Sequence, residues 1–213
     1  ITKLSYMKAN LNNMLILSIE SSCDETSAAV VKMTDTERQI LSNFTASQID
    51  THKLYGGVVP EIASRAHIEA ISNLTYSAIE ESGISVSDID LIGVTAYPGL
   101  IGALLVGVNF AKSLAYANNI PLVAVNHTHA HAAAAYFTYP ELNPPYIALT
   151  ASGGHTSISD VTSYTEFNLI GRTRDDAAGE AFDKVARVLG IPYPGGAELD
   201  RLASSGNSDA VSF

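Results

Sequence analysis

The chain has 213 residues and a formal net charge of −10, from 12 Lys and Arg against 22 Asp and Glu. Hydrophobic residues make up 46% and charged residues 16%, a composition that excludes a disordered chain and indicates one or two globular domains. The acidic balance excludes nonspecific binding to nucleic acid, so an RNA partner would need a local patch or a helper protein. The single cysteine, Cys23, and the lack of an apolar run of about 18 residues predict an intracellular protein with no membrane segment.

The N-terminal residues 1–13 are polar and aperiodic, and we expect a disordered leader or a cloning remnant before a native start at Met14. From Leu15 onward, short β-rich runs alternate with longer helical ones, which is typical of an α/β fold. The strands predicted in the first part of the chain are Leu15–Ser21, Ala28–Met33, Ile40–Ala46, Leu91–Ala96 and Leu122–Asn126. The helices predicted there are Pro60–Glu81, Leu100–Asn118 and Thr128–Phe137, and residues 52–59 are expected to form a turn.

After Asn143-Pro144-Pro145 the pattern of three strands begins again. It predicts strands Tyr146–Ala151, Thr156–Val161 and Phe167–Thr173 and a helix over Asp176–Leu189. At an offset of 130 residues (152 minus 22), Ser22 matches Ser152 and Thr26 matches Thr156. Together with the repeated strand pattern, these matches favour a duplicated domain. We therefore expect a first lobe over 14–143 and the start of a second, incomplete lobe over 144–213.

Three of the six histidines lie in the run Asn126-His127-Thr128-His129-Ala130-His131. His127 and His131 are four residues apart, so on a helix their imidazoles share one face and could bind one metal ion. The alternative is a polar helix start in which His127 only caps or forms hydrogen bonds. A zinc peptidase motif would place Glu directly after the first histidine, but Thr128 occupies that position.

Two related turns follow the opening strands of the two repeats. In the turn Ser152–Thr156, the Ser152 and Thr156 hydroxyls and backbone N–H groups could hold anionic oxygens. In the turn Ser22–Thr26, Asp24 could bind a phosphate-associated cation or water. Ordinary hairpin turns explain either segment alone, whereas their repetition favours a nucleotide held between two lobes.

The predicted helix over Asp176–Leu189 has one charged and one apolar face. We expect the apolar residues to pack against the sheet. The charged face is either solvated surface or part of a site, because the like charges of Asp176 and Glu180 disfavour the helix. The charged residues are Asp176, Glu180, Asp183 and Arg187; the apolar residues are Ala178, Phe182, Val185 and Leu189.

Long, ordered runs of this sequence resemble the tRNA N6-adenosine threonylcarbamoyltransferase family, formerly labelled O-sialoglycoprotein endopeptidase. They cover nearly all of Leu15–Leu202. The runs are Ile19–Thr26, Tyr55–Glu61, Ser64–His67, Pro98–Leu104, Ser152–Thr156, Asp175–Lys184 and Tyr193–Gly196.

The resemblance implies two ribonuclease H-like lobes of the actin, sugar kinase and Hsp70 fold, with the second lobe truncated. It implies transfer of the threonylcarbamoyl group from threonylcarbamoyl-AMP to N6 of adenosine 37 in tRNAs that read codons beginning with A. It also implies metal binding by His127 and His131. The adenylate contacts implied by the family are Thr150, Ala151, Ser152, Gly153, Gly154, Asp183 and Gly196. As catalytic residues we expect Asp24, Ser152 and His155.

The implied cofactor is one divalent metal ion, iron(II) or zinc, with ATP, ADP or AMP as nucleotide ligands. The implied partners are tRNA and, in bacteria, a paralogous dimerisation subunit and an ATPase helper, in the cytoplasm or in mitochondria. Two alternatives stay open. A nonenzymatic dimerisation paralogue would lack the histidine pair, and a zinc metallopeptidase would need a Glu where Thr128 stands.

Two departures from the family pattern matter. Asn126 stands where the family often has a further histidine. The family supplies a third metal ligand, an Asp, and a nucleotide-contacting Asn beyond the position of Phe213. We therefore expect a fragment that binds metal weakly, transfers nothing by itself, and either self-associates or leaves its second lobe partly disordered.

Overall fold

The computed structural model describes residues 13–212. Of the leader predicted over residues 1–13, all but Asn13 lies outside the described residues. The chain divides into two compact units: the first contains residues up to 48 and residues 58–142, and the second contains residues 49–57 and those from 143 onward. Within residues 13–212, no helix has the length and apolar composition of a membrane span.

The first unit is built on a five-stranded sheet with the order β3-β2-β1-β4-β5. β1 pairs antiparallel with β2 and parallel with β4, β2 pairs antiparallel with β3, and β4 pairs parallel with β5. Its strands are β1 (Met14–Glu20), β2 (Glu25–Met33), β3 (Arg38–Ser47), β4 (Leu91–Tyr97) and β5 (Leu122–Asn126).

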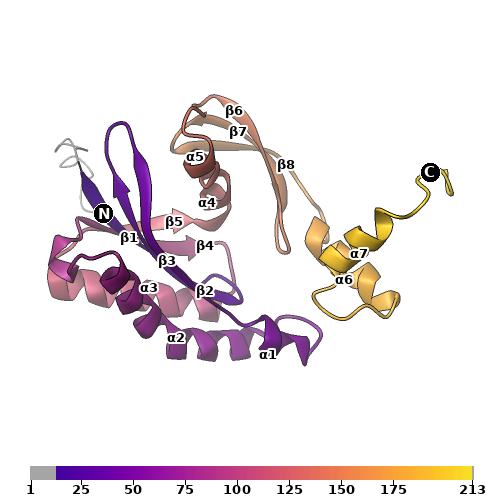
Figure 1. The fold of residues 1–213 in the computed structure, drawn as a ribbon, viewed down its shortest axis with the longest axis horizontal. Helices are drawn as coiled ribbons and strands as arrows, with labels where there is room; N and C mark the ends of the chain where they lie inside the picture. The colour runs from indigo at the N-terminus through magenta and orange to yellow at the C-terminus, as the bar shows by residue number, and fades with distance from the viewer. Residues whose placement is uncertain (1–12, 213) are drawn as a thin grey trace. The chain divides into compact units, whose positions relative to one another are not determined.

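Two long helices, α2 (Pro60–Glu81) and α3 (Ile101–Asn118), cover one face of this sheet (Figure 1). Alternate strand residues such as Leu17 and Ile92 point to this face and are fully buried, because side chains on a strand alternate between faces. A 3₁₀ turn, η2 (Val86–Asp88), follows α2. The short helices α4 (His127–Ala133) and α5 (Ala135–Thr138) follow β5.

Two local predictions for this part of the chain were wrong in detail. The helix expected over Thr128–Phe137 is divided at Ala134, which lies between the end of α4 at Ala133 and the start of α5 at Ala135. The turn expected over residues 52–59 overlaps a short helix, α1 (Ile49–Lys53), which belongs to the second unit. His52 in this helix is fully buried. Residues distant in the sequence therefore surround it, and local sequence patterns do not predict such contacts.

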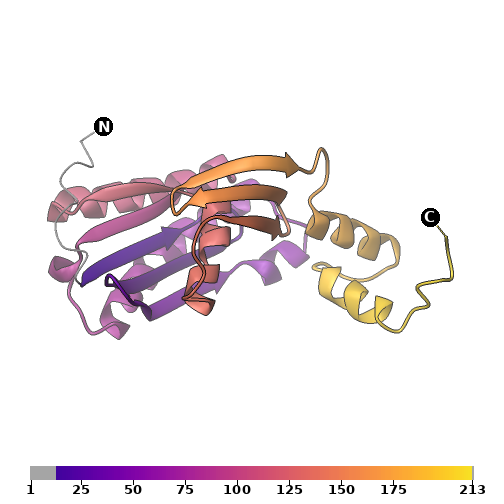
Figure 2. The same ribbon diagram turned by 90° about the horizontal axis from the view of Figure 1, so that it is seen from above.

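The second unit contains a three-stranded antiparallel sheet, β6-β7-β8, followed by two helices (Figure 2). Its elements are β6 (Tyr146–Ala151), β7 (Thr156–Ser163), β8 (Glu166–Arg172), α6 (Ala178–Val188) and α7 (Gly196–Ala203). We expected the apolar face of α6 to pack against the sheet, but Phe182, Val185 and Leu189 are 42%, 51% and 62% exposed. The helix contacts α7 instead.

The two units share their opening pattern of three antiparallel strands followed by a helix. In each, a matched threonine of the second strand bonds to the segment that follows the third strand: Thr26 bonds to His67 of α2, and Thr156 accepts a hydrogen bond from the Ala178 N–H at the start of α6. The strand order of the first unit, with two long helices on one face, is that of a ribonuclease H-like lobe. The predicted fold class, a duplicated α/β protein of this kind, is confirmed.

Candidate functional site

The strand β5 runs directly into the helix α4, so the sheet itself positions the first histidine. Asn126 ends the strand and caps the helix, with its Oδ1 accepting from the N–H groups of Thr128 and His129 at 2.9 and 3.2 Å. Asparagine is among the most favourable N-cap residues. Capping is therefore done by Asn126, and the ring of His127 is left for another role.

The imidazoles of His127 and His131 face each other from adjacent turns of α4. Their ring centroids are 4.5 Å apart with an interplanar angle of 80°, and the two Nε2 atoms are 3.0 Å apart. The i, i+4 spacing on a helix produces this approach. One nitrogen of each ring thus points to the same place, which is the arrangement in which two imidazoles bind one metal ion.

The other ring nitrogen of His127, Nδ1, contacts residues at the end of β1 and just after it. The Nδ1 atom lies 3.2 Å from Glu20 Oε2 and 3.2 Å from Ser22 Oγ. Glu20 also accepts a hydrogen bond from the backbone N–H of Ser22. Burial would raise the pKa of Glu20, but hydrogen bonds from the His127, Ser22 and Thr95 side chains and the Ser22 backbone outweigh it and lower the pKa to about 2.

Burial also affects the neighbouring histidines. The pKa of His131 is lowered, first by burial and then by the neighbouring His127, with Glu20 acting in the opposite direction. Burial lowers the pKa of His129 as well. A lowered pKa favours the neutral imidazole, which is the form that can donate a lone pair to a metal.

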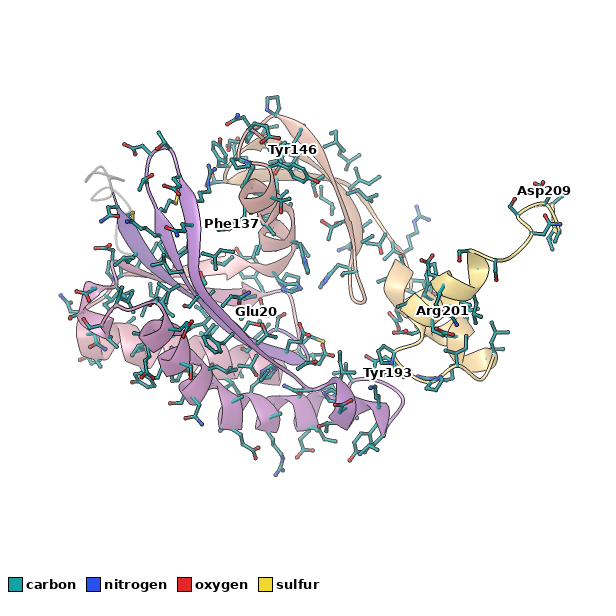
Figure 3. The ribbon with its side chains drawn as sticks, viewed as in Figure 1. Glu20, Phe137, Tyr146, Tyr193, Arg201 and Asp209 are labelled. Carbon is teal, nitrogen blue, oxygen red and sulfur yellow. The ribbon has the colours of Figure 1, made fainter. Side chains whose placement is uncertain are left out.

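The histidine pair borders a pocket of about 350 Å³ on the face of the first sheet opposite α2 and α3. Its floor consists of small residues in one cross-strand row, because Ala29, Ser18 and Gly93 pair across β2, β1 and β4. Glu20, labelled in Figure 3, also lines the pocket and ends β1. The lining residues are Ser18, Ile19, Glu20, Ser27, Ala29, Gly93, Thr95, Val125, His127, Ala130, His131 and Ala134.

The donor set suits a divalent transition metal in part. Two converging imidazole nitrogens, one of them backed by a carboxylate, are the usual pattern of histidine ligands and their supporting shell. Among residues 13–212, no third His, Cys, Asp or Glu completes a cluster of three ligands. The two imidazoles could therefore supply part of the coordination shell of a metal ion.

In the second unit, the predicted anion-binding turn is closed by Ser152 and His155. The Ser152 N–H donates to the His155 carbonyl at 2.8 Å, and the Ser152 hydroxyl accepts from the His155 N–H at 3.0 Å. The turn adjoins the start of α6, where the Gly179 N–H donates to the Ser152 carbonyl. Gly179 must lack a side chain because a Cβ would lie 2.8 Å from Gly153 Cα.

The other predicted substrate contacts of the second unit lie around this turn and α6. Thr150 and Ala151 end β6, and Gly153 and Gly154 are exposed. Asp183 and Gly196 come together: Asp183 Oδ1 accepts from the N–H groups of Gly195 and Gly196 at 2.8 and 2.9 Å. This oxygen therefore holds the loop before α7.

A lysine of α6 pairs with two carboxylates of the predicted charged face, one of which, Asp176, lies just before the helix. Lys184 lies 2.5 Å from Asp176 and 3.1 Å from Glu180, and its ammonium offsets their like charges. This exposed ion-pair cluster agrees with the reading of that face as solvated surface. The Arg187 guanidinium also donates to the Gly56 carbonyl within the same unit.

Asp24, the remaining predicted catalytic residue, lies in the turn between β1 and β2. Its carbonyl accepts from the Gln48 N–H at 3.0 Å, and its side chain bonds to Cys23. Asp24 does not line the pocket beside the histidines. The residues that sequence reasoning missed are Glu20, Ser22 and Thr95. Only the fold brings Glu20 and Ser22 to His127 and Thr95 to Glu20.

The strand order of the first unit and the partial repeat of its opening strands give the chain the fold shared by actin, sugar kinases and Hsp70. The ROK hexokinase of Thermus thermophilus is similar in fold, with a TM-score of 0.50 and 18% identity over 92% of this chain and 71% of that one. Residues 39–213 match the family model described as tRNA N6-adenosine threonylcarbamoyltransferase, TsaD. The chain belongs to this family, as its motifs predicted.

Curated relatives carry the same transferase name. A protein of Clostridium beijerinckii is 55% identical over 203 residues, which cover 95% of this chain and 59% of that protein. One of Clostridium novyi is 57% identical over 198 residues, covering 93% of this chain and 57% of the relative. The chain thus spans about three fifths of the length of the curated relatives it matches.

Proposed function

We propose that the whole protein transfers the threonylcarbamoyl group from threonylcarbamoyl-AMP to N6 of adenosine 37 in tRNAs that read codons beginning with A. Family membership supports the transferase class. The single observation that carries the proposal is the convergence of the His127 and His131 Nε2 atoms, 3.0 Å apart at the edge of a pocket. In the reaction, the N6 amine forms a bond to the carbamoyl carbon and loses one proton to solvent, the bond from that carbon to the phosphate oxygen breaks, and AMP leaves with that oxygen.

The residues of the first unit hold the metal in this proposal. His127 and His131 would hold iron(II) or zinc, and the ion would supply Lewis acidity when bound. Asn126 fixes the start of α4, and Glu20 and Ser22 hold the His127 ring from behind. The small side chains of the pocket floor leave room beside the histidines for an acyl group.

The nucleotide contacts are proposed for the second unit. The open glycines at 153 and 154 leave backbone N–H groups approachable, and the start of α6 adjoins the turn. A helix start and free N–H groups both favour a phosphate oxygen. Asp183 shapes the neighbouring loop through Gly195 and Gly196, and Gly196 presents backbone to the nucleotide. ATP, ADP and AMP are the further nucleotides that this turn would accept.

The net charge bears on how tRNA would be bound. With a net charge of −10, the chain offers little general attraction for a polyanion. From the family resemblance we propose that, in a bacterial enzyme, tRNA is bound together with a paralogous dimerisation subunit and an ATPase helper.

The proposal is tested with the full-length protein and unmodified tRNA. His131→Ala removes one of the two convergent nitrogens, and we expect transfer to fall at least about 100-fold. His129→Ala on the same helix is the matched control, since His129 does not line the pocket. Undiminished transfer by His131→Ala would remove the histidine pair from the reaction.

The two alternatives are outcomes of related measurements. Metal-dependent cleavage of a glycosylated protein that disappears in His127→Ala would favour a peptidase, although Thr128 only donates its hydroxyl to Asn126 and offers no carboxylate base. A protein that binds its paralogue but neither metal nor threonylcarbamoyl-AMP would favour a nonenzymatic subunit.

A further inference from the structure

Glu20 has an unusual position for a carboxylate, because it ends a central strand of the sheet and has its side chain only 30% exposed. Groups from three different segments converge on it: His127 at the start of α4, Ser22 after β1, and Thr95 in β4. A partly buried charge of this kind is held by hydrogen bonds that offset its lost hydration. A carboxylate that only holds the His127 ring in place could be replaced by any acceptor, so the charge of Glu20 needs a further explanation.

The contact with His127 determines which ring nitrogen carries the proton. An ionised carboxylate only accepts hydrogen bonds, so at the 3.2 Å contact the His127 Nδ1 must be the donor. A neutral imidazole has one N–H, and its Nε2 then carries a lone pair. That Nε2 is the atom that faces His131 at 3.0 Å.

A direct role of Glu20 as a metal ligand is not compatible with this geometry. Its Oε2 contacts Nδ1, whereas the atom that converges with His131 is Nε2 on the other side of the imidazole. The ring therefore lies between the carboxylate and the place where the two histidines meet. Ser22 Oγ is also 3.2 Å from Nδ1, but a neutral hydroxyl can donate or accept and does not by itself fix the tautomer.

We propose that Glu20 is a positioning residue: it holds His127 in the Nδ1–H tautomer and directs the Nε2 lone pair toward the position shared with His131. This inference rests on the proposed metal-dependent function and adds to it a residue that acts through the ligand. The carboxylate also makes His127 a stronger electron donor, because a hydrogen bond from the distal N–H raises the basicity of a ligating imidazole.

The first test reads the tautomer in the metal-free protein by NMR of ¹⁵N-histidine-labelled full-length protein, with His127 assigned through the His127→Ala variant. The wild type is expected to show Nδ1 protonated and Nε2 unprotonated. In Glu20→Gln, the side-chain amide can donate to Nδ1, and we expect a shift to the Nε2–H tautomer. Glu37→Gln removes a carboxylate from the exposed turn before β3 and should leave the His127 signals unchanged.

The second test titrates the same full-length proteins with Co²⁺ alone and follows its visible absorption bands. Glu20→Gln and Glu20→Ala should weaken Co²⁺ binding by about 10 to 100-fold, while Glu37→Gln should bind as the wild type does. Glu20→Gln is nearly isosteric, so it keeps the test decisive if Glu20→Ala fails to fold. Thermal unfolding of each variant separates a loss of metal affinity from a general loss of stability.

The outcomes distinguish this inference from the proposed function. Unchanged His127 tautomers together with Co²⁺ affinities within about twofold of the wild type would overturn the positioning role. If Co²⁺ affinity depends on Glu20 but transfer survives His131→Ala, the positioning role stands and the proposed function fails. Rescue of Co²⁺ affinity by Glu20→Asp, relative to Glu20→Ala, would support the requirement for a carboxylate at this place.

Discussion

At the scale of single residues, the turn after β1 contains a thiol that the fold makes unreactive. Burial, the neighbouring Asp24 and, more weakly, the charge of Glu20 raise the pKa of Cys23 to about 12. Only the thiolate reacts with an alkylating agent, so at pH 8 we expect iodoacetamide to modify Cys23 at least roughly 100-fold more slowly than free cysteine. A mass-spectrometric time course measures this rate, and the rate should recover in guanidinium chloride. Native-state alkylation as fast as that of free cysteine would contradict the prediction.

The same turn is held from the other side by a histidine that is not part of the pocket. His67 is fully buried, with Nδ1 bonded to the Thr26 hydroxyl at 2.7 Å and Nε2 bonded to the Cys23 carbonyl at 2.9 Å. His67→Ala leaves a cavity and two unpaired polar groups, so we expect the free energy of unfolding to fall by about 2–4 kcal/mol. Urea denaturation measures the change. Glu69→Ala, exposed on the same helix, should stay within about 0.5 kcal/mol of the wild type.

At the scale of the elements, α3 packs unusually close to the end of β1. A Cβ added at Gly107 would lie 2.4 Å from Ser21 Oγ, which donates to the Ala103 carbonyl and accepts from the Gly107 N–H. Gly107→Ala should therefore push the helix away and reduce the free energy of unfolding by about 1–3 kcal/mol, although alanine is the better helix former. Lys112→Ala, exposed on the same helix, is the control. A stabilised Gly107→Ala variant would show that the helix can shift freely.

Most of the helices and strands, but not all, can be predicted from the sequence alone. Hydrophobic periodicity predicts the eight strands and the helices α2, α3 and α6 within a few residues, because each has a long apolar pattern of its own. It does not predict α1, a helix of five residues that includes the buried His52. It also does not place the break between α4 and α5, since an Ala-rich run has no local signal for a stop.

The candidate site can also be predicted from the sequence only in part. The spacing of His127 and His131 predicts their approach because both lie on one short helix, and the structure places their Nε2 atoms together. The role of Glu20 could not be predicted, because its partner is 107 residues away in the sequence and only the strand order connects them. The available signal was a carboxylate at the end of an otherwise apolar strand.

At the scale of the whole molecule, the second unit exposes apolar side chains both on its sheet and on α6. Ile147 and Leu149 of β6 are 61% and 70% exposed, and Val185 and Val188 of α6 are 51% and 86% exposed. Extended apolar surface of this kind is unfavourable in water and favours association.

We therefore expect the 213-residue chain to self-associate, and Val188→Lys to shift it toward the monomer. Light scattering over a range of protein concentrations measures the average mass. Thr165→Lys adds the same charge at an exposed polar position between β7 and β8 and should leave the mass unchanged. A wild-type chain that stays monomeric at all concentrations would show that the exposed apolar surface does not drive association.

The two histidines of the first unit are anchored unequally, and in the proposed metal site this has a consequence for the rates at which an ion would enter and leave. His127 is held at its backbone by the end of β5 and at its ring by Glu20 and Ser22, whereas His131 lies one turn further along α4 and meets the His127 ring. Exchange of a bound ion should therefore begin with rotation of the His131 side chain, with His127 the last of the pair to let go. Release would be stepwise, and a chelator that occupies the vacated position would accelerate it.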